Sequence, residues 1–337
     1  MKKQPRVIGF TWTLDDARLI TERETWGDVL VEEARRDPSI VALSADLSRT
    51  TKMARFRQEF PERFFNVGVA EQNLVAVASG LASVGLRPVI CTYAMFASLR
   101  AAEFVRTDLA YNQRQVVVVG QLAGVAFGQG GPTHQALEDL ALLRAIPGLT
   151  VLAPCDGYEA GALLRQALSS QGPTYIRMGR GSDPAIHEVR DPDVRIGRAH
   201  VIEDGDDATI LACGPCVHDA RNASRRARRR GISVRVLDMH TIKPLDEGAV
   251  VRAARETGVI VTAEDHAKIG GLGSAVAEVL AHSGLACRVR ALGHPDRFLG
   301  AGVPEDLMHA SGVDEDGMLA ALGELLGVPP FQVEWAP

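Results

Sequence analysis

The sequence predicts an α/β protein made of two doubly wound domains. The chain has 337 residues, which exceeds the roughly 250–300 residues at which a single core stops growing. Apolar strand segments alternate with helical segments, as is typical of mostly parallel sheets covered by helices. Residues 179–199 are rich in Gly, Pro and Asp and interrupt this alternation. We therefore expect one domain on each side of that segment.

The first half of the chain alternates regularly between the two kinds of element. Residues 115–120, QVVVVG, are a continuous β-branched run that is typical of a parallel strand buried on both faces. Residues 121–135 are too glycine-rich for a helix or strand, and loops of this length in a compact domain are usually functional. The predicted strands are 39–47, 87–94, 115–120, 149–154 and 174–179, and the predicted helices are 23–36, 73–85, 98–111, 136–145 and 158–170.

The second half repeats the alternation and shows no short internal repeat. Its apolar runs are again short and are separated by helical patterns, so a second mostly parallel sheet is expected. The predicted strands are 208–213, 233–239, 258–265 and 287–293, and the predicted helices are 216–230, 246–256 and 272–283.

Composition excludes several classes of partner. Lys and Arg number 37 against 42 Asp and Glu, a net charge of −5, so no overall positive field draws the chain to nucleic acid or anionic lipid. We expect the arginine run at 225–230 to lie on a solvated helix face. The N-terminus lacks the apolar core of a secretory signal, and the five scattered cysteines do not suggest a disulfide framework. A cytoplasmic location is expected.

Three local motifs have an ordinary structural interpretation beside a functional one. Cys213-Gly-Pro-Cys216 lies where a thioredoxin-like redox pair would lie, but a glycine turn followed by proline suits any joint between a strand and a helix. The glycines at 270, 271 and 273 could present N–H groups to an anion or could serve close packing. His266 could act as a base or form structural hydrogen bonds. We favour the structural interpretation for all three.

Residues 66–73, NVGVAEQN, differ because they place Glu71 at the start of an otherwise apolar helix. A carboxylate there interacts favourably with the helix dipole, and beside an apolar interior it can also share a proton with a bound heterocycle. Three further segments follow in order: TYAMF at 92–96, GPTHQALEDLALLRAIPGLTVLAP at 131–154 and VRVLDMHTIKPLD at 234–246. Over roughly residues 20–325, the chain resembles the transketolase family of thiamine-diphosphate enzymes.

The resemblance implies a domain organisation. Residues 20–182 are expected to form a pyrimidine-binding domain for thiamine diphosphate, and residues 199–330 a transketolase C-terminal domain. Residues 1–19 would be an N-terminal extension, and residues 183–198 a linker.

The resemblance also implies roles for residues at the cofactor. The glutamate at the Glu71 position hydrogen-bonds a ring nitrogen of the aminopyrimidine, which favours the imino tautomer that removes the thiazolium proton. Tyr93 and Phe96 match the positions that form the wall of the pyrimidine pocket, with Tyr93 in place of a more usual phenylalanine. Stacking requires a flat face rather than a particular ring. Asp46 and Leu47 match a turn near the cofactor.

Other matches concern the substrate. His134, in GPTHQ, matches a catalytic histidine that contacts the oxygens of the reacting sugar. Arg23, Thr50 and Arg180 match positions that hold the distal phosphate of the substrate, which suits guanidinium groups and a hydroxyl.

One expected motif of the family does not occur in this sequence. Full-length transketolases bind Mg²⁺ and the diphosphate through Gly-Asp-Gly and downstream asparagines, and the similar string at 203–207, EDGDD, lacks those asparagines. We therefore expect no metal ligand for this Mg²⁺ in the chain. The chain is expected to be one subunit of a split transketolase, inactive alone and paired with a diphosphate-binding subunit in an α₂β₂ heterotetramer.

The expected reaction is transfer of a two-carbon ketol unit from a ketose, or ketose phosphate, to an aldehyde. Gln129 and Gly130 replace an acidic pair that is common in the family, and Leu122 replaces a frequent histidine. In the family, the aspartate contacts the C2 hydroxyl of the sugar and the histidine helps on the phosphate side, so the sugars are not identified. Alternatives are the β subunit of a 2-oxo-acid dehydrogenase and a 1-deoxyxylulose-5-phosphate synthase-like enzyme. Retention of GPTHQ and TYAMF favours transketolase. A non-catalytic scaffold is a third alternative, which the presence of Glu71 disfavours.

Overall fold

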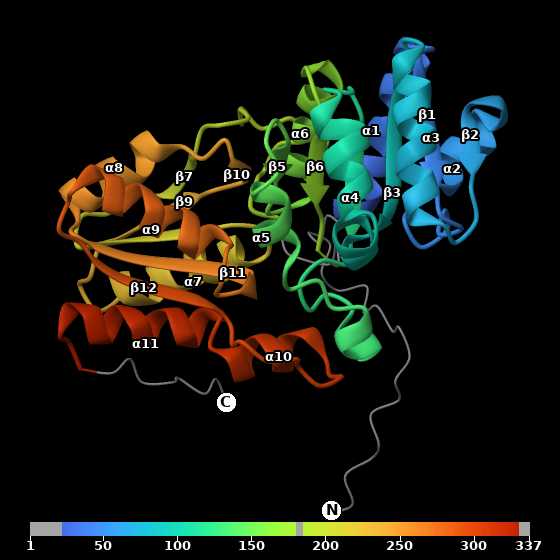
Figure 1. The fold of residues 1–337 in the computed structure, drawn as a ribbon. Coiled ribbons are helices and arrows are strands. Elements are labelled where there is room, and N and C mark those ends of the chain that lie inside the picture. Colours follow the sequence, from blue (N-terminus) through green and yellow to red (C-terminus); the bar gives the residue numbers. More distant parts are fainter. Residues whose placement is uncertain (1–21, 180–184, 330–337) are drawn as a thin grey trace, which may run out of the picture.

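The computed structural model describes residues 22–179 and 185–329, which form two α/β domains side by side (Figure 1). The two mostly parallel sheets confirm the predicted fold class. Arg180, predicted to bind phosphate, lies outside the described residues. In the described ranges we find no helix with both the length and the apolar character needed to cross a membrane.

The first domain is built on strands whose side chains are buried on both faces. Ile40 and Ala42 of one strand enter one core cluster, whereas the alternate residues Val41 and Leu43 enter another, as the two-residue period of a strand requires. The strands are β1 Ile40–Ser44, β2 Phe64–Asn66, β3 Arg87–Tyr93, β4 Val117–Gln121, β5 Thr150–Leu152 and β6 Thr174–Arg177.

Helices cover both faces of this sheet. On one face, α1 packs against α6, and on the other, α3 packs against β3 and the helical segment that follows β3 (Figure 1). The α-helices are α1 Glu22–Arg36, α2 Ala54–Glu59, α3 Glu71–Ser83, α4 Ala102–Phe104, α5 Asp139–Arg144 and α6 Gly157–Ser169. The 3₁₀ segments are η1 Pro61–Arg63 and η4 Gly128–Thr133, and the π-helical segments are η2 Phe96–Arg100 and η3 Val105–Tyr111.

The second domain has a sheet in the order β12-β11-β8-β9-β7, in which only β7 is antiparallel to its neighbour. Helices α7 and α11 pack on one face, and α8 and α9 pack together on the other. The strands are β7 His200–Glu203, β8 Ala208–Ala212, β9 Val234–Asp238, β10 Thr241–Lys243, β11 Val259–Ala267 and β12 Arg288–His294. The helices are α7 Cys216–Arg228, α8 Glu247–Glu256, α9 Leu272–Ser283, α10 Pro304–Ser311 and α11 Glu315–Leu326.

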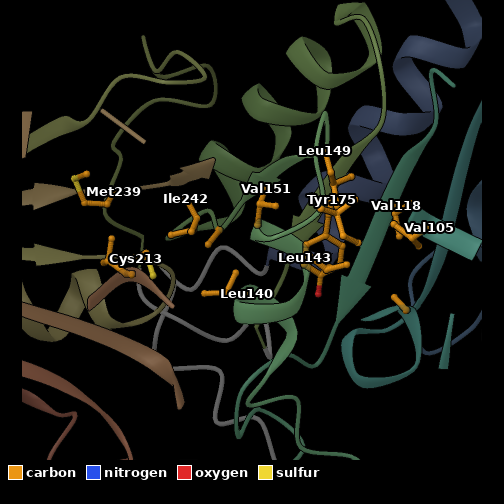
Figure 2. Packing of buried hydrophobic residues seen from close by; sticks show 14 of the residues in the cluster. Val105, Val118, Leu140, Leu143, Leu149, Val151, Tyr175, Cys213, Met239 and Ile242 are labelled. Carbon is orange, nitrogen blue, oxygen red and sulfur yellow. The ribbon is translucent and has the colours of Figure 1, made fainter. Parts of the chain in front are cut away.

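The two domains share a core and a sheet edge. Strand β10 leaves the second domain and pairs antiparallel with β5, so the first sheet has the order β10-β5-β6-β4-β3-β1-β2. Figure 2 shows one continuous group of apolar side chains that runs from Val118 and Tyr175 in the first domain to Cys213 and Met239 in the second. The relative placement of the domains is therefore set by a hydrophobic core.

Several elements differ from the prediction. The helix predicted over 98–111 is a run of wide π-helical turns around the short α4, beginning at Phe96. Strand β1 ends at Ser44 because the next turn places Asp46 in the left-handed region, with φ of 62°. Elements α2, β2, β7, β10, α10 and α11 were not predicted. Strands β2 and β10 have three residues each, too few for a periodic pattern, and form through pairing.

Candidate functional site

Glu71 is the first residue of α3, and its side chain is almost fully buried. The helix packs against the sheet through an apolar surface that includes Leu74, Val75 and Ala78. Within the described residues, one group donates a hydrogen bond to the carboxylate: Arg100 Nη1, 3.2 Å from Glu71 Oε2. The site therefore contains a buried carboxylate with capacity for a further hydrogen bond.

Arg100 comes from the π-helical segment η2. Its guanidinium carbon lies 4.6 Å from the centre of the Phe96 ring, and its side chain is 45% exposed. The wider turns of a π-helix change which side chains face one way, and such turns often occur at functional sites. Here the turn places Phe96 and Arg100 together beside Glu71. Arg100 was not predicted as a site residue, although its four-residue spacing from Phe96 was an available signal.

Four rings gather next to this carboxylate and arginine. Tyr93 and Phe96 are stacked, with ring centres 5.9 Å apart and planes at 24°. His134 meets Phe96 edge-on at 5.6 Å and Tyr93 at 6.4 Å, and Phe127 meets His134 at 5.3 Å. We call Tyr93, Phe96, Phe127 and His134 the aromatic group. Phe127 was not predicted as a site residue, because it lies in the long loop and follows no periodic pattern.

The structure thus brings together Glu71, Tyr93, Phe96 and His134, which the sequence had placed in separate segments. Tyr93 ends β3, and Glu71 begins α3 after β2, so both lie at the carboxyl edge of the sheet. Ligands of open α/β sheets bind at this edge. His134 reaches the same place through the loop that follows β4.

The turn that contains Asp46, Leu47 and Thr50 lies at the same edge, outside the aromatic group. Asp46 and Asn66 bind each other reciprocally, with both hydrogen bonds at 2.9 Å, so the turn is fixed to the segment leading into Glu71. The Thr50 hydroxyl donates to the carbonyl oxygen of Leu47 at 3.0 Å. Arg23 lies in α1, and its side chain is outside the described part of the chain.

The loop carrying His134 is held in place by the second domain. The backbone N–H of Val125 donates to the Asp265 carboxylate at 3.0 Å, and Gly302 N–H donates to the carbonyl oxygen of Gly128 at 3.1 Å. Gln135 Nε2 donates to the carbonyl oxygen of Gly300 at 3.1 Å. The position of His134 therefore depends on contacts that cross the domain boundary.

The three departures from the family pattern have different surroundings. A Cβ atom on Gly130 would lie 2.9 Å from both the His134 Cβ and the Phe127 ring, so glycine permits this close packing. Leu122 is nearly buried, and its backbone is left-handed with φ of 56°. Gln129 is exposed. Gly130 is therefore the departure that directly shapes the aromatic group.

The Cys213-Gly-Pro-Cys216 motif and His266 both have surroundings that favour a structural role over a catalytic one. Cys213 and Cys216 are free and buried at the joint between β8 and α7, and burial raises the pKa of both thiols well above the usual range. This disfavours the thiolate that redox exchange requires. His266 Nδ1 donates to the Ala267 carbonyl oxygen at 2.7 Å, and its Nε2 accepts from Ala141 N–H at 3.3 Å. These contacts fit the structural interpretation.

The glycine-rich start of α9 already has an anion, which is supplied by the chain itself. The Glu264 carboxylate accepts hydrogen bonds from the N–H groups of Leu272 and Gly273 at 2.7 and 2.8 Å. A Cβ atom on Gly271 would lie 1.9 Å from Glu264 Oε2, so a side chain there cannot be accommodated. The glycines at this helix start therefore serve close packing around an internal carboxylate.

Two family models match the chain. Residues 19–184 match the model of the transketolase pyrimidine binding domain, and residues 197–318 match that of the transketolase C-terminal domain. Together they cover most of the sequence and both sheets of the structure.

Known proteins of similar sequence or structure point the same way. The chain is 38% identical to a subunit of the apulose-4-phosphate transketolase of Phocaeicola vulgatus, over 89% of this chain and 96% of that protein. It is 41% identical to 1-deoxy-D-xylulose-5-phosphate synthase 1 of Geobacter sulfurreducens, over 88% of this chain but 46% of that protein. A solved structure described as a split gene transketolase, inactive beta4 tetramer, superposes with a TM-score of 0.85 at 41% identity. The match covers 92% of this chain and 99% of the other.

Proposed function

The chain belongs to the transketolase family, and from this premise we propose that it is the pyrimidine-binding subunit of a two-component, thiamine-diphosphate-dependent transketolase. The observation that carries the proposal is the buried Glu71 carboxylate beside the stacked Tyr93 and Phe96 rings. We propose that residues 20–182 form the pyrimidine-binding domain and residues 199–330 the C-terminal domain. We also propose that the enzyme is cytoplasmic, where its five free cysteines would stay reduced.

The residues of this site fit the aminopyrimidine end of thiamine diphosphate. That ring is flat and carries nitrogen atoms that can donate or accept protons, so it needs an apolar wall and one carboxyl group. Tyr93 and Phe96 supply aromatic faces, and Glu71 supplies the carboxyl group. When bound, the cofactor would supply a nucleophilic carbon and an electron sink for cleavage next to a carbonyl group.

The roles of the chain's own groups follow from their positions. Glu71 would hold a proton against the pyrimidine ring nitrogen. Arg100 would fix the orientation of the Glu71 carboxyl group through its hydrogen bond to Oε2. Burial excludes water from this proton. His134, whose Nδ1 lies 2.9 Å from the Thr133 hydroxyl, would present its other ring nitrogen to the oxygen atoms of a sugar.

The charged end of the cofactor would be held by another chain. We propose that a diphosphate-binding subunit supplies Mg²⁺ and its ligands and completes an α₂β₂ heterotetramer. The solved split-gene relative, described as an inactive beta4 tetramer, supports this proposal, because a chain of similar extent assembles there without activity. Similarity to one subunit of the Phocaeicola vulgatus transketolase likewise supports an enzyme made of more than one kind of chain.

The proposed reaction transfers a two-carbon ketol unit from a ketose or ketose phosphate to an aldehyde, with Thr50, Arg23 and Arg180 holding a distal phosphate. Gly130 and Leu122 replace groups that would hydrogen-bond a hydroxyl or phosphate. A site without those partners should select its sugar differently, because buried hydrogen bonds to hydroxyl groups discriminate strongly between substrates. We therefore expect a donor or acceptor other than an ordinary pentose phosphate.

A second candidate is a 1-deoxyxylulose-5-phosphate synthase-like reaction, favoured by the 41% identity to the Geobacter sulfurreducens enzyme. That reaction uses pyruvate and releases carbon dioxide, whereas ketol transfer releases none. The two candidates are therefore separable by one assay.

The experiment combines this chain with the diphosphate-binding subunit encoded in the same genome. The purified complex is supplied with thiamine diphosphate and Mg²⁺, then with a panel of ketoses and aldehydes, and separately with pyruvate and an aldehyde phosphate. We expect ketol transfer by the complex and none by either chain alone. Turnover by this chain alone would contradict the proposal, and carbon dioxide release from pyruvate would favour the second candidate.

A further inference from the structure

Asp265 is a buried carboxylate of the second domain that contacts the loop carrying His134. It lies in β11 and is 4% exposed. The backbone N–H of Val125 donates to both of its oxygens, at 3.0 Å from Oδ1 and 3.2 Å from Oδ2. A buried charge is unfavourable unless hydrogen bonds satisfy it, so this contact helps to stabilise the carboxylate. Asp265 therefore has a partner in the loop of the candidate site as well as partners in its own domain.

Other buried contacts fix the orientation of this carboxylate. His294, the last residue of β12, is fully buried, and its Nε2 lies 2.8 Å from Asp265 Oδ1. The His294 Nδ1 lies 2.8 Å from the hydroxyl of Ser311, at the end of α10. Arg177 Nη2 donates to the backbone carbonyl oxygen of Asp265 at 2.7 Å, so the main chain is held as well. A side chain held by such contacts is pre-organised, as a group that positions a functional residue must be.

Asp265 meets the loop at the point where the loop is closed. Gly124 and Ala136 pair reciprocally, with both backbone hydrogen bonds at 3.0 Å, so residues 125–135 leave and return at one place. Gly124 has a φ of 60°, and a Cβ atom there would lie 1.9 Å from Asp265 Oδ2. The carboxylate thus lies directly against the backbone of this closure, which only glycine permits.

The loop of residues 125–135 needs such outside contacts because its own hydrogen bonds form local turns. The His134 N–H, for example, donates to the carbonyl oxygen of Gly131 at 3.0 Å. Turns of this kind shape a loop but do not place it relative to the rest of a site. Asp265 supplies a contact that places the loop at its base.

The residues proposed to bind the pyrimidine ring reach the site from other elements. Glu71, Tyr93 and Phe96 come from α3, β3 and η2 of the first domain. His134 comes from the loop whose base contacts Asp265. A shift of this loop would therefore move the proposed sugar contact and leave the proposed proton contact at Glu71 in place.

We propose that Asp265 is a positioning residue, through which the second domain sets the position of His134 and thereby the use of the sugar substrate. The inference rests on the proposed function, in which His134 contacts the sugar and Glu71 acts on the cofactor. Removal of the Asp265 carboxylate should then impair sugar turnover and spare proton exchange at the cofactor. A general loss of stability would impair both together.

The first test uses the full chain alone and needs no substrate. Hydrogen exchange of peptides covering residues 122–136, followed by mass spectrometry, should be faster in Asp265→Ala by about tenfold or more, because the Val125 N–H loses a charged acceptor. Asp265→Asn keeps one side-chain oxygen and should restore most of the protection. The matched control is Glu264→Ala, which removes a neighbouring buried carboxylate that binds the start of α9, and it should leave these peptides unchanged. Exchange at the wild-type rate in Asp265→Ala would overturn the proposal.

The second test uses the complex with the diphosphate-binding subunit and the best ketose and aldehyde of the substrate panel. In Asp265→Ala, kcat/KM for the ketose should fall by about tenfold or more, whereas exchange of the thiazolium proton should stay within about twofold of the wild-type rate. Equal losses in both measurements would overturn the proposal. Gly124→Ala, which would press a Cβ atom against Asp265 from the loop side, should reproduce the selective loss and decides the matter if Asp265→Ala does not fold. If the wild-type complex turns over no sugar, the proposed function fails, and hydrogen exchange of residues 122–136 still decides whether Asp265 holds the loop.

Discussion

Replacement of Arg177 by methionine should strongly destabilise the protein. Arg177 is 3% exposed, and its Nε lies 2.9 and 3.2 Å from the two oxygens of Asp139. Its Nη2 donates to the carbonyl oxygens of Ala136 at 3.2 Å and of Asp265, in the second domain, at 2.7 Å. Methionine has a similar length and no charge. It would leave the Asp139 carboxylate buried with Tyr175 Oη at 2.8 Å as its remaining donor.

Breaking a buried ion pair by removing one partner costs roughly 3–5 kcal/mol. The free energy of unfolding in urea, followed by circular dichroism, should fall by that amount. The matched control is Arg35→Met, because the Arg35 and Glu59 side chains are 49% and 31% exposed and such pairs contribute little. A loss below about 1 kcal/mol for Arg177→Met would refute the claim that this buried ion pair stabilises the fold.

Three further predictions concern other parts of the chain. Under native conditions, a thiol reagent should modify Cys287 quickly and the other four cysteines slowly, because those four are buried; fast reaction of a second thiol would contradict this. An NMR titration should give His309 a pKa above the usual 6.5, since a hydrogen bond to Asp314 raises it. The stability from this pair should be fully present below pH 6.5 and lost as pH rises through the folded pKa; Asp314→Asn should return the pKa toward 6.5. Glu264→Ala should lower the free energy of unfolding by about 1–3 kcal/mol, because two buried N–H groups lose their acceptor; an unchanged urea midpoint would contradict that assignment.

Local patterns predicted much of the fold. The apolar runs at 115–120 and 208–213 became buried strands β4 and β8, because burial on both faces leaves a clear signal in sequence. The pairing of β10 with β5 had no such signal. It depends on a three-residue strand from one domain meeting the edge of the other, which only the packed structure determines.

The part of the candidate site that could be predicted is the part in which the type of residue itself indicates the chemistry. Glu71 stood out because a carboxylate at the start of an apolar helix is unusual, and the structure places it beside Tyr93, Phe96 and His134. Phe127 belongs to the same group through tertiary contacts alone.

The most direct test of the central claim concerns the proton that Glu71 is proposed to hold. The measurement is the rate at which the thiazolium proton of bound thiamine diphosphate exchanges with deuterium, in the complex with the diphosphate-binding subunit. We predict that Glu71→Gln slows this exchange by about 10²-fold or more, whereas Glu62→Gln, at an exposed glutamate, leaves it unchanged. Exchange at the wild-type rate in Glu71→Gln would contradict the account.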